Sequence, residues 1–378
     1  MRFAPRFASK SAAQPITQRK HNEMKKYTLF STLTILALVF GGVSMSYGQA
    51  GLTPDTEVET DKRAQTGMKF LSTSVDARAS AIGSAMTAEL TGSSVSMFYN
   101  PASMGFMSGR MSAAATNMSF IADIGYTQFS AAFRPSSSAN YGVVGVSVVS
   151  VDYGDFHHTI RANNDDGFIE NGTYSPTAMA VGLGYARSFG DRFSAGANIK
   201  LVFQDIGSGF ATSQDFDSGA IETTEDYNVR TVAYDFGIVY ATGFESLVIG
   251  MSARNFAQEQ SYVRERFELP LTFQIGMSMN LVDLTAIDPD MHSIQLHVDA
   301  QRPRDFTEHV RFGLEYTFMN IVSLRGGFEQ LGLNEEQGFS AGAGLRYSFG
   351  GFDVGADYAY TDFGLFGAVS RIGLQIGL

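Results

Sequence analysis

The chain of 378 residues has no Cys and no Trp, only 9 Pro, and an excess of acidic over basic residues. The absence of Cys excludes disulfides, thiolate chemistry, Cys-based metal sites and a lipid-modified N-terminal Cys. The formal net charge of -11 argues against nucleic acid as a partner, because phosphate binding needs a basic face. No apolar run reaches the roughly 20 residues that a membrane-spanning helix needs.

The sequence is instead rich in Gly (40), Phe (31) and Tyr (16). Abundant aromatics with scarce Pro suit a chain built from many paired strands. The mean hydropathy is -0.03. This value is too polar for a bundle of transmembrane helices. It fits a barrel in which half of each strand faces lipid and the other half faces a polar lumen.

The N-terminal part has the three-part pattern of a secretory signal peptide. Residues 24–50 contain the basic Lys25 and Lys26, then the apolar run 29–43, then small residues at cleavage-site spacing. We interpret residues 1–23 as an N-terminal extension ahead of the true start at Met24. A transmembrane anchor is the alternative to the signal peptide, but the run is shorter than a spanning helix requires. The acidic segment 51–66 is predicted to be a flexible leader.

Two different patterns divide the rest of the chain. Residues 67–108 carry small residues without alternation, which predicts a plug of short helices and loops. Residues 109–378 alternate apolar and polar side chains, and in 271–281 Phe273, Ile275 and Met277 share one face. Successive side chains of a strand point to opposite faces, so alternation indicates a sheet that is apolar on one side. The predicted strands are 110–120, 126–134, 141–152, 175–188, 193–206, 228–241, 247–256, 269–281, 293–301, 309–318, 321–329, 338–349, 352–361 and 367–378.

This pattern predicts an all-β fold, a transmembrane antiparallel β-barrel of about 14 strands with an N-terminal plug. Most predicted strands have about 9 to 12 residues, the length that a tilted strand needs to cross a bilayer. Every second connection is short, as periplasmic turns should be, except 282–292. The connections 153–174, 207–227 and 257–268 are predicted outer loops. At the Gly350-Gly351 turn a two-residue hairpin would pair Phe349 with Phe352, both on the apolar face. A soluble sandwich is the competing fold, and the signal peptide and loop rhythm favour the barrel in the bacterial outer membrane.

The predicted lumen face carries charges of both signs. Glu315 and Arg325 oppose each other across the turn at Asn320, and Arg346 lies diagonal to Asp353 and Asp357. We interpret these charges as a structural lattice of ion pairs rather than as a pore or ligand site. The predicted lattice consists of Lys200, Arg254, Arg311, Glu315, Arg325, Arg346, Asp353, Asp357 and Arg371.

No set of nucleophile, base and acid stands out, so we expect no enzymatic activity and no cofactor. His157-His158 beside Asp155 could in principle hold a metal, but an exposed polar loop is the more ordinary interpretation. Residues 163–167 lack the alternating acids and the terminal Glu of a calcium loop. An Asx-rich turn is therefore expected there. We expect no metal site.

Residues 69–106 contain the one segment with a motif. Phe70-Leu71, Asp76-Ala77-Arg78 and Gly83 are followed by Asn100-Pro101-Ala102 just before the first strand. The combination resembles the PorV/PorQ family, part of the wider FadL-like superfamily of outer-membrane barrels. The resemblance implies a fourteen-strand barrel with an N-terminal hatch. For PorV-like members it implies a role in type IX secretion, in which the barrel receives cargo with a C-terminal signal domain. Asp76 and Arg78 could pin the plug to the charged wall.

Two functions follow as hypotheses. The first is a secretion-associated barrel that binds secreted cargo or other secretion-system proteins through its outer loops. The alternative is a FadL-like channel for uptake of hydrophobic small molecules, in which the small apolar residues of 79–88 could line a pocket. Either role implies contact with outer-membrane lipid and lipopolysaccharide.

Overall fold

The computed structural model describes residues 66–378 except 91, 137–139, 162, 211–223, 263–264 and 331–337. The predicted N-terminal extension, the signal peptide and the leader up to residue 65 lie outside the described residues, as does most of the predicted outer loop 207–227. No helix among the described residues is long and apolar enough to cross a membrane.

Fourteen antiparallel strands close into one barrel. The first and last strands pair, with Ser112 opposite Gly377, and the carbonyl of Leu378 accepts from the amide of Met111 at 2.9 Å. The wall strands are β1 (Met111–Ser119), β2 (Gly125–Phe133), β3 (Val143–Asp152), β6 (Thr177–Phe189), β7 (Phe193–Phe210), β8 (Thr224–Ala241), β9 (Val248–Phe256), β12 (Thr272–Asn280), β13 (His292–Pro303), β14 (His309–Phe318), β15 (Val322–Gln330), β16 (Phe339–Phe349), β17 (Phe352–Asp362) and β18 (Ala368–Gly377). The predicted fold class is confirmed.

Alternation along each strand sorts side chains between lipid and lumen. In β12, Phe273 and Ile275 are exposed on the outside, whereas Thr272 and Gln274 are buried inside. A closed barrel has no free sheet edge, so its backbone groups can all be paired within a bilayer. The outward apolar side chains then replace contacts with water by contacts with lipid.

The two ends of the barrel differ in their connections. The end that holds the carboxyl terminus has short turns, and Phe349 pairs with Phe352 across Gly350-Gly351 as predicted. The longer connection 282–292 at this end contains a 3-10 turn, η5 (Leu281–Leu284), capped by the side chain of Asn280. We call this end periplasmic because outer-membrane barrels have short turns there.

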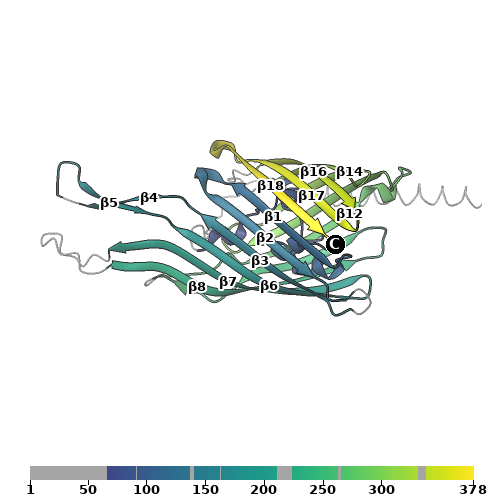
Figure 1. The fold of residues 1–378 in the computed structure, drawn as a ribbon, viewed down its shortest axis with the longest axis horizontal. Coiled ribbons are helices and arrows are strands. Elements are labelled where there is room, and N and C mark those ends of the chain that lie inside the picture. Colours follow the sequence, from purple (N-terminus) through teal and green to yellow (C-terminus); the bar gives the residue numbers. More distant parts are fainter. Residues whose placement is uncertain are drawn as a thin grey trace, which may run out of the picture. The chain divides into compact units, whose positions relative to one another are not determined.

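The opposite, outer end carries extra structure that the sequence did not predict. The expected loop 153–174 contains a hairpin of β4 (Phe156–Arg161) and β5 (Phe168–Tyr174), which Figure 1 shows extending beyond the wall strands. A second short pair, β10 (Gln260–Ser261) and β11 (Arg266–Phe267), lies in the connection after β9. Two 3-10 turns, η4 (Ile121–Asp123) and η6 (Gly364–Phe366), complete this end.

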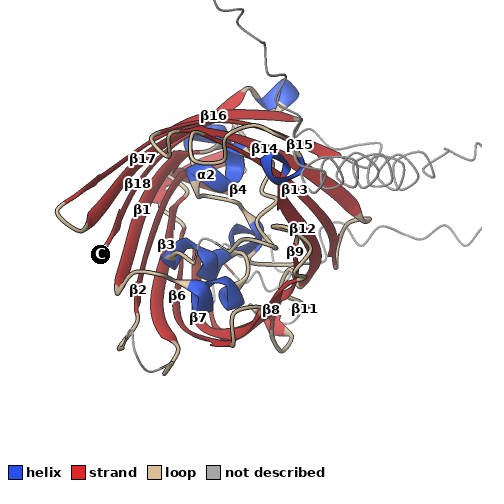
Figure 2. Ribbon diagram, turned by 90° about the vertical axis from the view of Figure 1, so that its right-hand side faces the viewer, coloured by secondary structure: helices blue, strands red, loops and turns tan. Residues whose placement is uncertain are grey.

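The N-terminal segment lies inside the barrel, as the view along it shows (Figure 2). It enters at the outer end, where Thr66 pairs with Glu268 of the β9–β12 connection. It then forms η1 (Lys69–Ser72), α2 (Ala77–Ala81), η2 (Ser94–Phe98) and η3 (Pro101–Phe106) before β1 begins. Helices this short have no independent stability, so packing against the wall must hold them.

Inward-facing glycines let this plug approach the wall. A Cβ on Gly237 of β8 would lie 1.9 Å from the side-chain oxygen of Asn100. Gly313 and Gly327 pair across β14 and β15, and both face Ile82 and Gly83 of the plug. A larger residue at Gly237 would collide with the side chain of Asn100, and at Gly313 or Gly327 with plug backbone, so the wall is shaped to this plug.

Candidate functional site

Each residue of the plug motif has a distinct structural task. Asp76 caps α2 by accepting a hydrogen bond from the amide of Ala79 at 2.8 Å. Phe70 is buried in apolar surroundings at the outer side of the plug. Gly83 has a left-handed backbone with φ of 63° and lies against the backbone of β14 and β15. A side chain there would be both strained and obstructed.

Asn100 joins the plug to the wall through its side chain. Its Oδ1 accepts from the amide of Ala102 at 3.1 Å and so caps η3, with Pro101 in the first helical position. Its Nδ2 donates to the carbonyls of Thr87 at 2.7 Å and Ile238 at 3.1 Å. The same amide therefore satisfies backbone groups of the plug and of β8. Pro at this position is already set for a helical start.

Arg78 forms the main charged contact between plug and wall. Its Nε and Nη2 donate to the two carboxylate oxygens of Glu315 at 2.9 and 3.0 Å. Its Nη2 also lies 2.9 Å from Glu89. Arg325 pairs with the same Glu315, and with Asp357 at 2.6 Å. We call the five residues Arg78, Glu89, Glu315, Arg325 and Asp357 the plug network.

Burial and charge shift the pKa values of plug residues. Burial lowers the pKa of Arg78, but Glu315 and Glu89 outweigh burial, so the pKa lies well above its usual value. Burial raises the pKa of Asp76 above 3.8, and its hydrogen bond from Ala79 only partly offsets this. Burial likewise raises the pKa of Tyr99, whose hydroxyl lies 2.7 Å from that of Ser74. These shifts favour a charged Arg78 and a neutral Tyr99.

The other predicted lattice charges fall into separate clusters. Lys200 pairs with Asp235 at 2.8 Å, and Arg311 pairs with Glu329. Arg371 donates to the carbonyl of Ser74 and the hydroxyl of Thr361 rather than to an acid. Arg254 donates to the carbonyl of Leu71 and lies over the ring of Tyr99. The wall therefore holds several small clusters and not one continuous lattice.

Two predicted members depart from the expected pairing. Arg346 lies opposite Gly355 and therefore diagonal to Asp353 and Asp357, as predicted, but it forms no ion pair with either. Asp353 is exposed and accepts from Ser348 instead. Asp357 already binds Arg325 and Gln375, and Asp353 lies at the periplasmic end of β17, next to the turn.

The predicted lattice lacked several contributors, among them Glu89 and Asn255. Glu89 and Arg78 are the only charged residues between 77 and 109, so the sequence did hold a signal for their pairing. Asn255 had none. It adopts a left-handed backbone with φ of 62° at a register shift between β8 and β9. Its backbone N–H donates there to the carboxylate of Asp235 at 2.7 Å.

An apolar region fills the outer half of the lumen. It combines plug residues with inward wall residues near the outer ends of their strands, and loop aromatics such as Phe120 and Phe363 pack on it. We call it the outer apolar cluster. It consists of Met68, Phe70, Leu71, Val75, Met118, Tyr126, Val151, Ala178, Ala180, Val202, Val229, Ala233, Leu269 and Val369.

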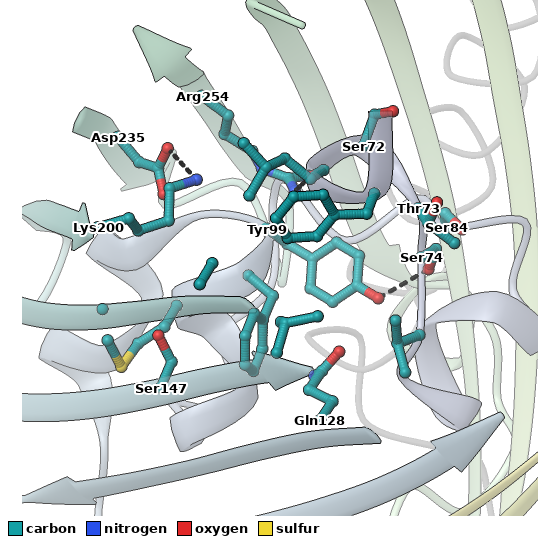
Figure 3. Close-up of a pocket in the computed structure, with 18 of the residues that line it drawn as sticks. Ser72, Thr73, Ser74, Ser84, Tyr99, Gln128, Ser147, Lys200, Asp235 and Arg254 are labelled. Carbon is teal, nitrogen blue, oxygen red and sulfur yellow. Dashed lines mark hydrogen bonds and ion pairs between the residues drawn. The ribbon is translucent and has the colours of Figure 1, made fainter. Parts of the chain in front are cut away.

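A cavity of about 40 Å³ lies between this cluster and the charged wall. Phe70, Leu71 and Ala180 line its apolar side, and Lys200 and Arg254 its charged side (Figure 3). The small apolar residues 79–88 do not form such a lining: among them only Ser84 reaches this cavity. Ala79, Ile82 and Met86 pack instead with Tyr99 in the plug core.

No family model matches the chain, and no curated protein does. Solved structures do. The Ralstonia pickettii toluene transporter TbuX is 13% identical with a TM-score of 0.51, over 79% of this chain and 96% of that one. The Pseudomonas putida toluene transporter TodX is 11% identical (TM-score 0.49; 79% and 96%), and a Pseudomonas aeruginosa FadL homologue is 10% identical (0.43; 78% and 95%). Of these three, only TbuX exceeds a TM-score of 0.5, and at 13% identity it establishes the fold alone.

Proposed function

We propose that the chain, which has the fold of FadL-like barrels and an apolar outer belt, resides in the bacterial outer membrane. Within that frame we propose that it is a non-enzymatic channel for uptake of hydrophobic small molecules. The observation that carries the proposal is the outer apolar cluster. A lumen meant only for water-soluble solutes has no use for an apolar outer half, because water and ions would have to cross it.

The route for such a molecule begins among the loop aromatics and leads to the cavity beside the plug. An apolar molecule would exchange contacts with water for contacts with Phe70, Leu71 and Ala180, at roughly 25 cal/mol per Å² of buried area. The cavity is small, so the plug must shift before anything passes. The direct contact between Arg78 and Glu315 would have to adjust in that step.

The test is uptake of radiolabelled toluene by cells that carry the chain in their outer membrane. Ala180→Arg places a charge in the outer apolar cluster, and we expect the initial uptake rate to fall several-fold. Asp290→Arg introduces the same side chain at the exposed periplasmic end and serves as the control. Equal rates for Ala180→Arg and the unaltered chain, at equal amounts in the membrane, would reject the channel proposal.

A role in type IX secretion is the second proposal. It is supported by the resemblance of the plug motif and by the β4–β5 hairpin, which exposes Phe156, Phe168 and Ile169 beyond the wall strands. Exposed apolar side chains on a projecting element suit a protein partner.

This second proposal is tested by recovering the tagged chain in mild detergent and identifying bound proteins. Exported proteins with a shared C-terminal β-domain should accompany the full chain and should be lost when residues 155–175 are replaced by a short Gly-Ser linker. If only lipid or hydrocarbon is recovered, the secretion role is rejected and the channel is favoured.

A further inference from the structure

A second, larger cavity lies on the periplasmic side of the plug. Its volume is about 560 Å³, within the range of roughly 300–1,000 Å³ typical of ligand sites. It reaches from the turn residues Ser246 and Asn320 inward to Arg78 and Glu315. We call it the periplasmic vestibule. Because the barrel is closed, its walls separate it from lipid, so only solutes from the periplasm can enter it.

The lining of the vestibule combines apolar side chains, such as those of Leu90 and Val248, with polar and charged ones. Hydroxyl and amide groups face it from several strands, among them Ser293, Gln295 and Asn320, whose side chains form no hydrogen bond with a described residue. Such groups can donate to a bound solute without first giving up an internal partner. The lining therefore favours a polar ligand.

One arginine at the inner end of the vestibule, Arg346, forms no ion pair with a described residue, although Glu315 and Asp357 lie near enough to attract its charge. The side chain of Arg346 borders both this cavity and a smaller one next to it, of about 110 Å³. Its Nε is buried without a hydrogen bond. Two neighbouring acids are engaged elsewhere, because Glu315 binds Arg78 and Arg325, and Asp357 binds Arg325 and Gln375. A third acid of the lining, Asp353, accepts from Ser348 and pairs with no cation among the described residues.

An unpaired, largely enclosed guanidinium is costly, and it cannot lose its proton. Its planar fork of donors matches the oxygens of a carboxylate or a phosphate. We propose that the periplasmic vestibule binds a small, water-soluble oxyanion, held by Arg346. The site lies across the plug from the outer apolar cluster and does not depend on the proposed transport function.

The experiment is calorimetric titration of the purified full chain in detergent at low ionic strength, with inorganic phosphate and with acetate as separate probes. We expect saturable binding of at least one probe. Arg346→Gln should weaken it by about tenfold or more, which corresponds to about 1.4 kcal/mol. Arg346→Lys should keep part of the affinity, because an ammonium retains the charge but not the fork.

Arg302→Gln, in an exposed pair with Glu308 at the outer end, is the matched control and should bind as the unaltered chain does. Arg346→Gln should fold normally, since it removes an unpaired charge, and an unchanged β-sheet circular dichroism spectrum checks this. Absence of saturable binding for both probes, or equal affinity in Arg346→Gln, overturns the proposal.

Discussion

The two halves of the lumen are held by different forces. The outer half is an apolar cluster in which plug and wall meet through side chains such as Phe70 and Val202. The inner half is held by the plug network around Arg78 and Glu315. Apolar contacts have no fixed direction and can re-form after a displacement, whereas bidentate ion pairs fix one geometry. The difference indicates a plug that is held firmly at its inner end and can yield at its outer end.

The largest effect should come from Arg78→Ala, which breaks the plug network in the inner half of the lumen. Removing Arg78 leaves Glu315 and Glu89 buried with less compensation, and breaking a buried pair costs about 3–5 kcal/mol. We expect the free energy of unfolding in urea to fall by that amount, and conductance in planar bilayers to rise as the plug loosens. Arg302→Ala, which removes an exposed pair, should cost at most about 1 kcal/mol. Unchanged conductance in Arg78→Ala would contradict the anchoring role.

A smaller effect is expected from Gly327→Ala, which disturbs the fit rather than the charges. The added Cβ would lie 2.0 Å from the amide nitrogen of Gly83, so plug or wall must shift, at about 1–3 kcal/mol. The neighbouring Gly326→Ala is the matched control, because nothing lies within 4 Å of its Cβ. The difference between their urea midpoints measures the fit. Equal midpoints would mean that the plug does not press on β15.

Leu71→Met tests whether the outer half tolerates a change of shape. Leu and Met have similar volumes, and such exchanges in apolar surroundings cost less than about 1.5 kcal/mol. Glu315→Gln is equally conservative in shape but removes a charge shared by two arginines, so we expect it to cost clearly more. The two are compared by urea unfolding. A larger loss for Leu71→Met would reverse the contrast between the halves.

The smallest effect is expected from Asp76→Asn. Asn caps a helix as well as Asp does, so the bond to Ala79 can be kept. Burial raises the pKa of Asp76 above 3.8, which means that the folded chain holds this proton more tightly than the unfolded chain. The contribution of Asp76 to the stability of the folded chain is therefore complete below pH 3.8 and is lost as pH rises. We expect the free energy of unfolding in urea at pH 7 to be equal or slightly higher in Asp76→Asn. The variant should also not lose this contribution to stability as pH rises. A clear destabilisation at pH 7 would contradict this.

The sequence predicted the wall well and the partners of individual side chains less well. Alternation is a local property, so all fourteen strands were placed, including the pairing of Phe349 with Phe352. Ion pairs depend on which neighbour is already engaged, and this explains why Arg346, which lies diagonal to Asp353 and Asp357 as predicted, forms an ion pair with neither. The outer apolar cluster combines plug, wall and loops that are distant in sequence, and no local pattern marks it. The β4–β5 hairpin was missed because its polar residues resemble those of a loop.

The wall glycines have a consequence for engineering and for descent. At Gly313 and Gly327 the barrel lacks side chains where the plug backbone passes, and at Gly237 it lacks one where the side chain of Asn100 lies. A plug taken from another barrel would meet gaps where it needs contacts and collisions where it needs space. Segment 67–108 and strands β8, β14 and β15 should therefore be exchanged only as one unit, and chimeras that divide them should assemble poorly even when both parents insert efficiently.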